Sequence, residues 1–206
     1  QGTEGYFQSG NFTFTEDFLS KELDYRWIGL RGPREDFISI TKKGLQINPF
    51  EVNIKEMKPA SILFYRQQHK TFTFTTQMEY TPESEEDLAG ITCFQNEKSN
   101  YVFGITKKDD EYHILLERNE RTGRRGEHKS EIIASEKILL NGSLSLRVEA
   151  RGDKYEFSYS LHESEFVNVG GIVSGDILST DISGGVTGAL IGLYATSAND
   201  AIPVDK

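Results

Sequence analysis

Side chains that could act as nucleophiles or bind transition metals are scattered through this sequence. A serine nucleophile of the hydrolase type would sit in a Gly-x-Ser-x-Gly turn, and the sequence contains none. The only cysteine, Cys93, has apolar neighbours in a strand-like segment, which predicts a buried and unreactive thiol. The histidines lack the i, i+4 spacing and paired cysteines of a zinc site. They are His69, His113, His128 and His162.

Paired carboxylates are the second candidate chemistry, because glycoside hydrolysis needs only two acids at a suitable separation. The densest acidic group is Glu83, Glu85, Glu86 and Asp87. With 32 Asp and Glu residues in the chain, some acids must be neighbours by chance. We therefore interpret this group as a solvated face, carried by one helical turn over residues 82–88, and assign no catalytic residue.

Two further charged groups leave alternatives open. Carboxylates near the ends of a sandwich can bind structural calcium, although no loop has the EF-hand pattern. The candidates by position are Glu16, Asp17, Asp181 and Asp200. A basic group in this acidic chain predicts a hairpin loop or, alternatively, a docking surface for an acidic neighbour. Its members are Arg118, Arg121, Arg124 and Arg125.

Composition excludes several classes of protein. The formal net charge of −9 over 206 residues argues against a nucleic-acid-binding protein, whose affinity comes mostly from cations on phosphates. The longest apolar runs, such as residues 62–65 and 189–191, are too short to span a bilayer. A single cysteine fits a cytoplasmic or a secreted or periplasmic protein equally well.

Alternation of apolar and polar residues is the dominant pattern, and it predicts the elements that would position any site. Half-buried antiparallel strands are expected at residues 11–18, 44–47, 62–66, 71–80, 90–96, 101–107, 112–118, 129–134, 144–150, 155–159, 166–169 and 188–195. The fold class expected is all-β, a two-sheet antiparallel β-sandwich of the jelly-roll or lectin kind. Tight hairpins are expected at Asn141-Gly142 and Gly152-Asp153, and Trp27 is expected in the core.

Several motifs occur together in a specific order. They are Leu23-Asp24-Tyr25-Arg26-Trp27, Leu30-Arg31-Gly32-Pro33, Arg66-Gln67-Gln68-His69, Tyr80-Thr81-Pro82-Glu83-Ser84, Leu146-Arg147-Val148-Glu149-Ala150 and Ile191-Gly192-Leu193-Tyr194-Ala195-Thr196. This ordered set resembles the carboxy-terminal domain of β-xylosidases and α-L-arabinofuranosidases of glycoside hydrolase family 43, over about residues 11 to 196.

The resemblance implies a concanavalin A-like sandwich whose catalytic partner is a separate five-bladed propeller, expected ahead of residue 1 in the same polypeptide. It also implies that a loop of the sandwich packs over the propeller and helps to wall its sugar pocket, which would accept xylo- or arabino-oligosaccharides. The matching residues are Arg66, Gln67, Gln68, His69 and Phe72. Many relatives have an aromatic residue directly after the histidine, where this sequence has Lys70. An ordinary polar hairpin edge is the alternative interpretation of this loop.

The expected organisation is a linker or expression remnant over residues 1–10 and one sandwich domain over residues 11–206. Relatives continue into a final strand where this sequence stops at Lys206, so the domain either lacks that strand or has a bare sheet edge. A free-standing carbohydrate-binding module is the alternative function, and an interaction sandwich without a sugar role is a third.

Overall fold

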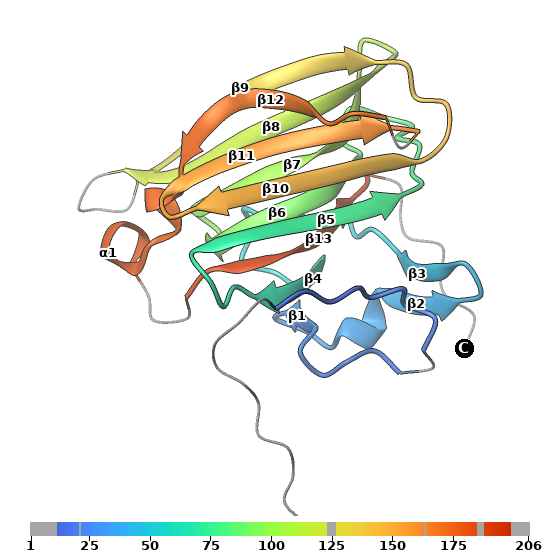
Figure 1. The fold of residues 1–206 in the computed structure, drawn as a ribbon, viewed down its shortest axis with the longest axis horizontal. Helices are drawn as coiled ribbons and strands as arrows, with labels where there is room; N and C mark the ends of the chain where they lie inside the picture. The colour runs from blue at the N-terminus through green and yellow to red at the C-terminus, as the bar shows by residue number, and fades with distance from the viewer. Residues whose placement is uncertain (1–11, 21, 123–126, 163, 185–187, 199–206) are drawn as a thin grey trace, which may run out of the picture.

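Two antiparallel sheets lie face to face in the computed structural model, which describes residues 12–20, 22–122, 127–162, 164–184 and 188–198 (Figure 1). The larger sheet has the order β1 (Ile28–Leu30), β4 (Ala60–Arg66), β13 (Leu190–Thr196), β6 (Leu88–Asn96), β7 (Ser99–Lys108), β8 (Glu111–Thr122) and β9 (Glu127–Ile138). The smaller sheet has the order β12 (Val167–Ser174), β11 (Lys154–Leu161), β10 (Leu144–Arg151) and β5 (Thr71–Met78). The predicted all-β sandwich is confirmed.

The strand predictions are correct for most of the chain. Every strand expected after residue 40 is present, with ends that differ by a few residues. The strand expected at residues 11–18 is wrong, because the described part of that segment, residues 12–18, forms no strand. Its backbone is turned instead, with Phe18 at φ 55° and its N–H bonded to the Glu16 carboxylate. The short strands β1 and β2 (Ile38–Thr41) were not expected.

One of the two predicted hairpins is correct, the one whose two strands belong to the same sheet. Gly152 and Asp153 form the two-residue loop between β10 and β11, with Gly152 at φ 68° as predicted. Asn141-Gly142 is wrong as a hairpin, because β9 belongs to the larger sheet and β10 to the smaller one. The connection therefore crosses between the sheets at one end of the sandwich.

The main core fills the space between the two sheets. Its side chains come alternately from β6, β7 and β8 on one side and from β10 and β11 on the other. The ring of Phe157 lies 5.3 Å from that of Phe103 and 5.6 Å from that of Tyr101. Cys93 is 1% exposed in this core, which confirms the predicted buried thiol. Burial raises the pKa of that thiol, so it is held in its unreactive protonated form.

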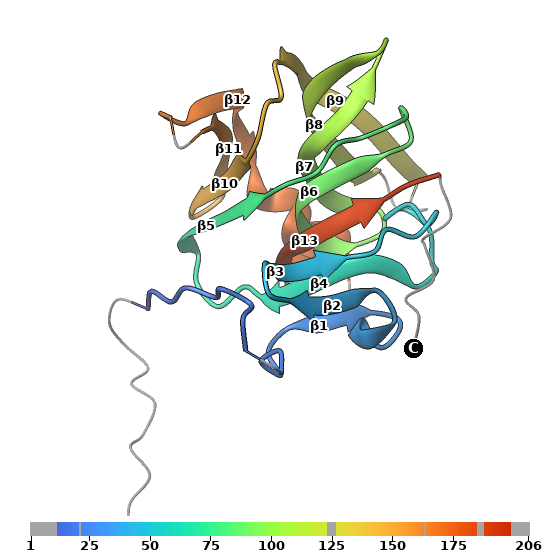
Figure 2. The same ribbon diagram turned by 90° about the vertical axis from the view of Figure 1, so that its right-hand side faces the viewer.

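A second layer covers the part of β4 that the smaller sheet does not reach. It consists of the hairpin β2 with β3 (Gly44–Ile47) and the segment before β1, which Figure 2 shows below β5. Trp27 is 4% exposed there and packs against Phe18 and Tyr65, so its predicted core role is confirmed.

Helical structure is short among the described residues: η1 (Arg34–Asp36), η2 (Gly175–Leu178) and α1 (Thr180–Ser183). No helix in this described part has the length and apolar character needed to cross a bilayer. The helical turn expected at residues 82–88 is a single hydrogen-bonded turn, closed by the Asp87 N–H on the Ser84 carbonyl at 3.3 Å.

The acidic group in that turn is only partly a solvated face. Glu83, Glu85 and Glu86 are exposed as predicted, whereas the prediction is wrong for Asp87, which is 2% exposed. Its carboxylate accepts hydrogen bonds from the backbone N–H groups of Glu83 and Ser84 and from the Ser197 hydroxyl. Asp87 therefore ties this turn to the end of β13.

The described members of the basic group, Arg118 and Arg121, lie on β8, and the pairing of Thr122 with Glu127 confirms the predicted β8–β9 hairpin. Arg118 is ion-paired with Glu120 and Glu131. Arg121 donates a hydrogen bond to the carbonyl of Ser183 in α1. Arg124 and Arg125 lie outside the described residues, and the docking role of this group stays a prediction.

Candidate functional site

The connection between β4 and β5 contains the residues that the sequence singled out. Its backbone is held at both ends, because the Gln67 N–H donates to the Ala189 carbonyl at 3.1 Å and the Gly152 N–H donates to the Lys70 carbonyl at 2.9 Å. The first bond reaches the segment that leads into β13, and the second reaches the β10–β11 hairpin. The loop is thus fixed against both sheets.

The Gln67 side chain orders the loop from within. Its amide nitrogen donates to the His69 carbonyl at 3.0 Å, and its amide oxygen accepts from the Tyr155 hydroxyl at 3.0 Å. Burial raises the pKa of Tyr155, so its hydroxyl stays a donor through the physiological range. The half-buried Gln67 therefore connects the exposed His69 to the core.

Aromatic side chains extend this surface toward the N-terminal segment. The Phe12 ring is stacked on that of His69, with 5.2 Å between ring centres and 16° between planes. Phe14 lies 5.3 Å from Tyr65, and the Arg26 guanidinium lies 5.4 Å from the Phe14 ring. Arg26 thus adds a cation over an aromatic face, an arrangement stabilised by the negative charge of the ring face.

Arg26 is held in place by Asp24. Its Nε and terminal nitrogen donate to the two carboxylate oxygens of Asp24 at 2.9 and 2.8 Å, and its backbone N–H donates to the same group at 2.8 Å. These hydrogen bonds from Arg26, first from its side chain and then from its backbone, lower the pKa of Asp24 to about 2. The bidentate pair fixes the orientation of the guanidinium plane.

The residues expected in the loop do not all lie on its surface. Arg66, Gln68 and His69 are exposed and Gln67 is half-buried, so the structure brings these four together. Phe72 is separated from them, because its ring packs in the main core and lies 5.9 Å from that of Tyr155 in a T-shaped contact.

Sequence reasoning missed Phe12, Phe14, Tyr25 and Arg26 as members of this surface, which we call the loop face together with residues 66–70. The alternation of Phe12 and Phe14 indicated a strand with buried rings, whereas both are exposed here. Tyr25 is 79% exposed. The available signal was its place in the motif around Trp27, which was interpreted only as core.

The proposed calcium ligands do not form one group in the described structure. Glu16 and Asp17 accept hydrogen bonds from the backbone N–H groups of Phe18 and Leu19 in a local turn near the β2–β3 hairpin. Asp181 lies in α1, on the opposite side of the molecule in Figure 1. Asp200 lies outside the described residues. Within the described ranges, no three His, Cys, Asp or Glu side chains are grouped as metal ligands.

The histidines are equally dispersed. His113 bonds to Ser135, His128 to Asn119 and His162 to Asn141, while His69 stacks on Phe12. The loop face differs from these sites because it brings aromatic, cationic and amide groups together.

The two antiparallel sheets place the chain in the class of concanavalin A-like β-sandwiches. The family model described as "Beta xylosidase C-terminal Concanavalin A-like domain" matches residues 15–205, and the chain belongs to that family.

Comparisons with individual proteins agree with this family assignment. The chain is 23% identical over 201 residues to a xylosidase/arabinosidase of Humicola insolens, covering 94% of this chain and 36% of that protein. It is 23% identical over 191 residues to a non-reducing end α-L-arabinofuranosidase of Bacteroides ovatus, covering 90% and 34%. A family 43 structure from a capybara gut metagenome superposes with a TM-score of 0.86 at 42% identity, covering 93% and 36%. The chain therefore spans about a third of the length of these relatives.

Proposed function

We propose that this chain is the accessory domain of a larger glycoside hydrolase, and that its loop face docks on a catalytic domain in the same polypeptide. The family to which it belongs is a carboxy-terminal domain, and the matched relatives are about three times as long. Their names, a xylosidase/arabinosidase and an α-L-arabinofuranosidase, support xylo- or arabino-oligosaccharides as the substrate class of the parent enzyme.

The observation that carries this proposal is the stacking of Phe12 on His69. Phe12 is the first described residue, so the chain enters the sandwich on the surface of the β4–β5 loop. Figure 2 follows this segment past the connection between β4 and β5. A domain attached ahead of it would lie beside the loop face, where exposed aromatic rings and a fixed guanidinium suit the centre of an interface.

The same face supports a role at the edge of a sugar pocket. Arg66, Gln68 and His69 present donors and acceptors that can bond to sugar hydroxyls, and the bonds of Gln67 hold their backbone rigid. A wall on one side of a pocket leaves no path for a long chain and favours cleavage of terminal sugars.

The experiment is a comparison of His69→Ala and Gln67→Ala in the parent polypeptide. We expect kcat/KM on nitrophenyl xyloside or arabinofuranoside to fall about tenfold for each, because positioning at the pocket is lost. His113→Ala, on the outer part of β8, is the control and is expected to leave kcat/KM unchanged. Unaltered kinetics for both loop variants, with the fold intact by circular dichroism, would contradict the proposal.

A carbohydrate-binding module that acts without a catalytic partner is the second candidate. The observation that favours it is a pocket lined by Tyr80 and Tyr112, at the end of β5 that is farther from the β4–β5 loop. Unchanged kinetics for the loop variants together with sugar binding by the chain alone would favour this alternative.

A further inference from the structure

A surface pocket lies at the end of the sandwich opposite the loop face. Two connections cross between the sheets there, residues 79–87 from β5 to β6 and residues 139–143 from β9 to β10. Where they diverge they leave a pocket of about 370 Å³. It is lined by Glu79, Tyr80, Thr81, Tyr112, Leu140 and Gly142. This volume falls in the lower part of the range of about 300–1,000 Å³ that is typical of small-molecule sites.

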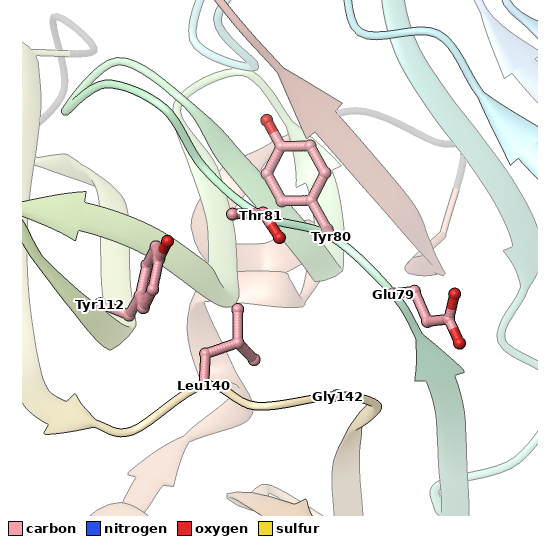
Figure 3. Close-up of a pocket in the computed structure, with 6 residues that line it drawn as sticks. All are labelled: Glu79, Tyr80, Thr81, Tyr112, Leu140 and Gly142. Carbon is pink, nitrogen blue, oxygen red and sulfur yellow. The ribbon is translucent and has the colours of Figure 1, made fainter.

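The pocket is lined by two aromatic rings and by polar groups at its edge. Figure 3 shows the rings of Tyr80 and Tyr112 on two sides of the space, with Leu140 between them. Glu79 lines the edge of the pocket, and Figure 3 shows its carboxylate directed away from the two rings and Leu140. Both tyrosines are half-buried and pack on the main core, so the rings are held by the fold and lose little freedom when a ligand binds.

The polar groups of this pocket have hydrogen-bonding capacity left over. Within the described residues, the hydroxyls of Tyr80, Thr81 and Tyr112 make no hydrogen bond to protein. Burial, and the nearby carboxylates of Asp87 and Glu83, raise the pKa of Tyr80 to about 12. Its hydroxyl is therefore a neutral group at physiological pH, able both to donate and to accept.

These features select a ligand by its chemistry. A sugar ring has apolar C–H faces that pack on aromatic rings and equatorial hydroxyls that bond at its edge, so it matches both halves of the pocket. Glu79 is the only charged side chain among the described lining residues, and its negative charge disfavours an anionic ligand.

We propose that this pocket binds one ring of a neutral oligosaccharide, at a site separate from the loop face. The β5 strand has eight residues and joins the two ends, so the two sites lie roughly 26 Å apart at about 3.3 Å per residue. A sugar held here is beyond the reach of the β4–β5 loop. Binding at this site would keep the enzyme on its polymeric substrate. This proposal does not depend on the docking of the loop face on a catalytic domain.

The test is a titration of the 206-residue chain with xylotetraose, followed by backbone amide chemical shifts. We expect saturable shifts at residues 79–81, 112 and 140–142, with a Kd on the order of 1 mM because only one ring is buried. Shifts confined to residues 66–70, or no saturable shifts at ten times that concentration, would overturn the proposal.

Variants at the rim make the assignment specific. Thr81→Trp fills the pocket from an exposed position and is expected to abolish the saturable shifts without unfolding the chain. Ile132→Ala removes an exposed side chain of β9 that belongs to neither the pocket nor the loop face, and it is the control, with the Kd expected unchanged. Binding by Thr81→Trp as tight as that of the unaltered chain would place the ligand elsewhere.

An anionic probe tests the charge argument. Tetragalacturonate carries a carboxylate on each ring, and the exposed Glu79 is expected to weaken its binding about fivefold relative to xylotetraose. Equal binding of the two probes would contradict a neutral ligand class.

Discussion

The Tyr155 hydroxyl donates a hydrogen bond of 3.0 Å to the side-chain oxygen of Gln67, 88 residues earlier in the chain. Tyr155 is buried on β11 of the smaller sheet, whereas Gln67 follows β4 of the larger sheet. The bond therefore fixes the candidate loop to the sheet that it does not belong to. Gln67 also donates to the His69 carbonyl. The buried Tyr155 therefore helps, through Gln67, to hold the backbone of the exposed His69 in place.

Removal of that hydroxyl is expected to loosen the loop without unfolding the sandwich. In Tyr155→Phe the Gln67 oxygen loses its donor, and we expect a loss of about 1 kcal/mol in the free energy of unfolding. Amide hydrogen exchange at residues 67–70 is expected to become faster, and urea denaturation gives the stability. Tyr159→Phe, on the same strand, is the control, because within the described residues the Tyr159 hydroxyl makes no hydrogen bond to this loop. Equal exchange rates in both variants would show that the Tyr155 bond does not order the loop.

Asp87 is expected to make the free energy of unfolding depend on pH in the acidic range. Burial tends to raise the pKa of Asp87, but the hydrogen bonds from Ser197, Glu83 and Ser84 outweigh it and hold the pKa below its ordinary value. The unfolded chain binds the proton at a pH of about 3.9 and the native chain only at lower pH. This contribution to stability is therefore complete above that value and is lost as the pH falls through the native pKa.

The corresponding variant is Asp87→Asn. Both carboxylate oxygens accept hydrogen bonds, so an amide must direct an N–H group toward a donor, and we expect a loss of about 2 kcal/mol at pH 7. The difference from the unaltered chain is expected to shrink as the pH falls below about 4, measured by urea denaturation. Glu86→Gln, an exposed neighbour, should change neither value. A difference that stays constant over this pH range would show that Asp87 is not the titrating group.

The sequence predicted the sandwich well because the alternation of side chains reports directly which face of a strand is buried. It predicted poorly where the same alternation had another cause. Phe12 and Phe14 alternate with threonines, yet they lie on the loop face, where a partner surface rather than a core is expected to cover them. Local sequence cannot distinguish these two kinds of burial.

The candidate site was predicted only in part, for a similar reason. Gln67 and His69 came from an ordered family resemblance, but their link to Tyr155 and Phe12 depends on which strands become neighbours. The pocket beside Tyr80 and Tyr112 could not be anticipated, because Asn141-Gly142 indicated a hairpin where the chain crosses between sheets. Such connections are set by the packing of the two sheets and not by the turn residues.

Close strand contact in the larger sheet makes Gly104 sensitive to any side chain. A Cβ atom at this position would fall on the Ala89 carbonyl oxygen of the neighbouring strand. Because backbone cannot move without disrupting the pairing of β6 with β7, Gly104→Ala is expected to cost about 3 kcal/mol or more in thermal or urea denaturation. Gly152→Ala is the control. It meets no atom within 4 Å, and its φ of 68° is expected to cost about 1–2 kcal/mol. A smaller loss at Gly104 than at Gly152 would contradict the close approach.

The main core and the second layer around Trp27 are expected to unfold together. Cys93 lies in the main core and Trp27 in the layer formed with the β2–β3 hairpin, and the side chains of Tyr65 and Phe74 pack against both. Because these shared contacts couple the two clusters, loss of one exposes part of the other, and a single cooperative transition is expected. Tryptophan fluorescence and labelling of Cys93 by a thiol reagent should therefore give the same urea midpoint.

Without urea, the Cys93 thiol is expected to react only at the rate at which the chain opens, because it is buried and protonated. A fluorescence transition that clearly precedes thiol exposure would show that the layer around Trp27 is an independent folding unit.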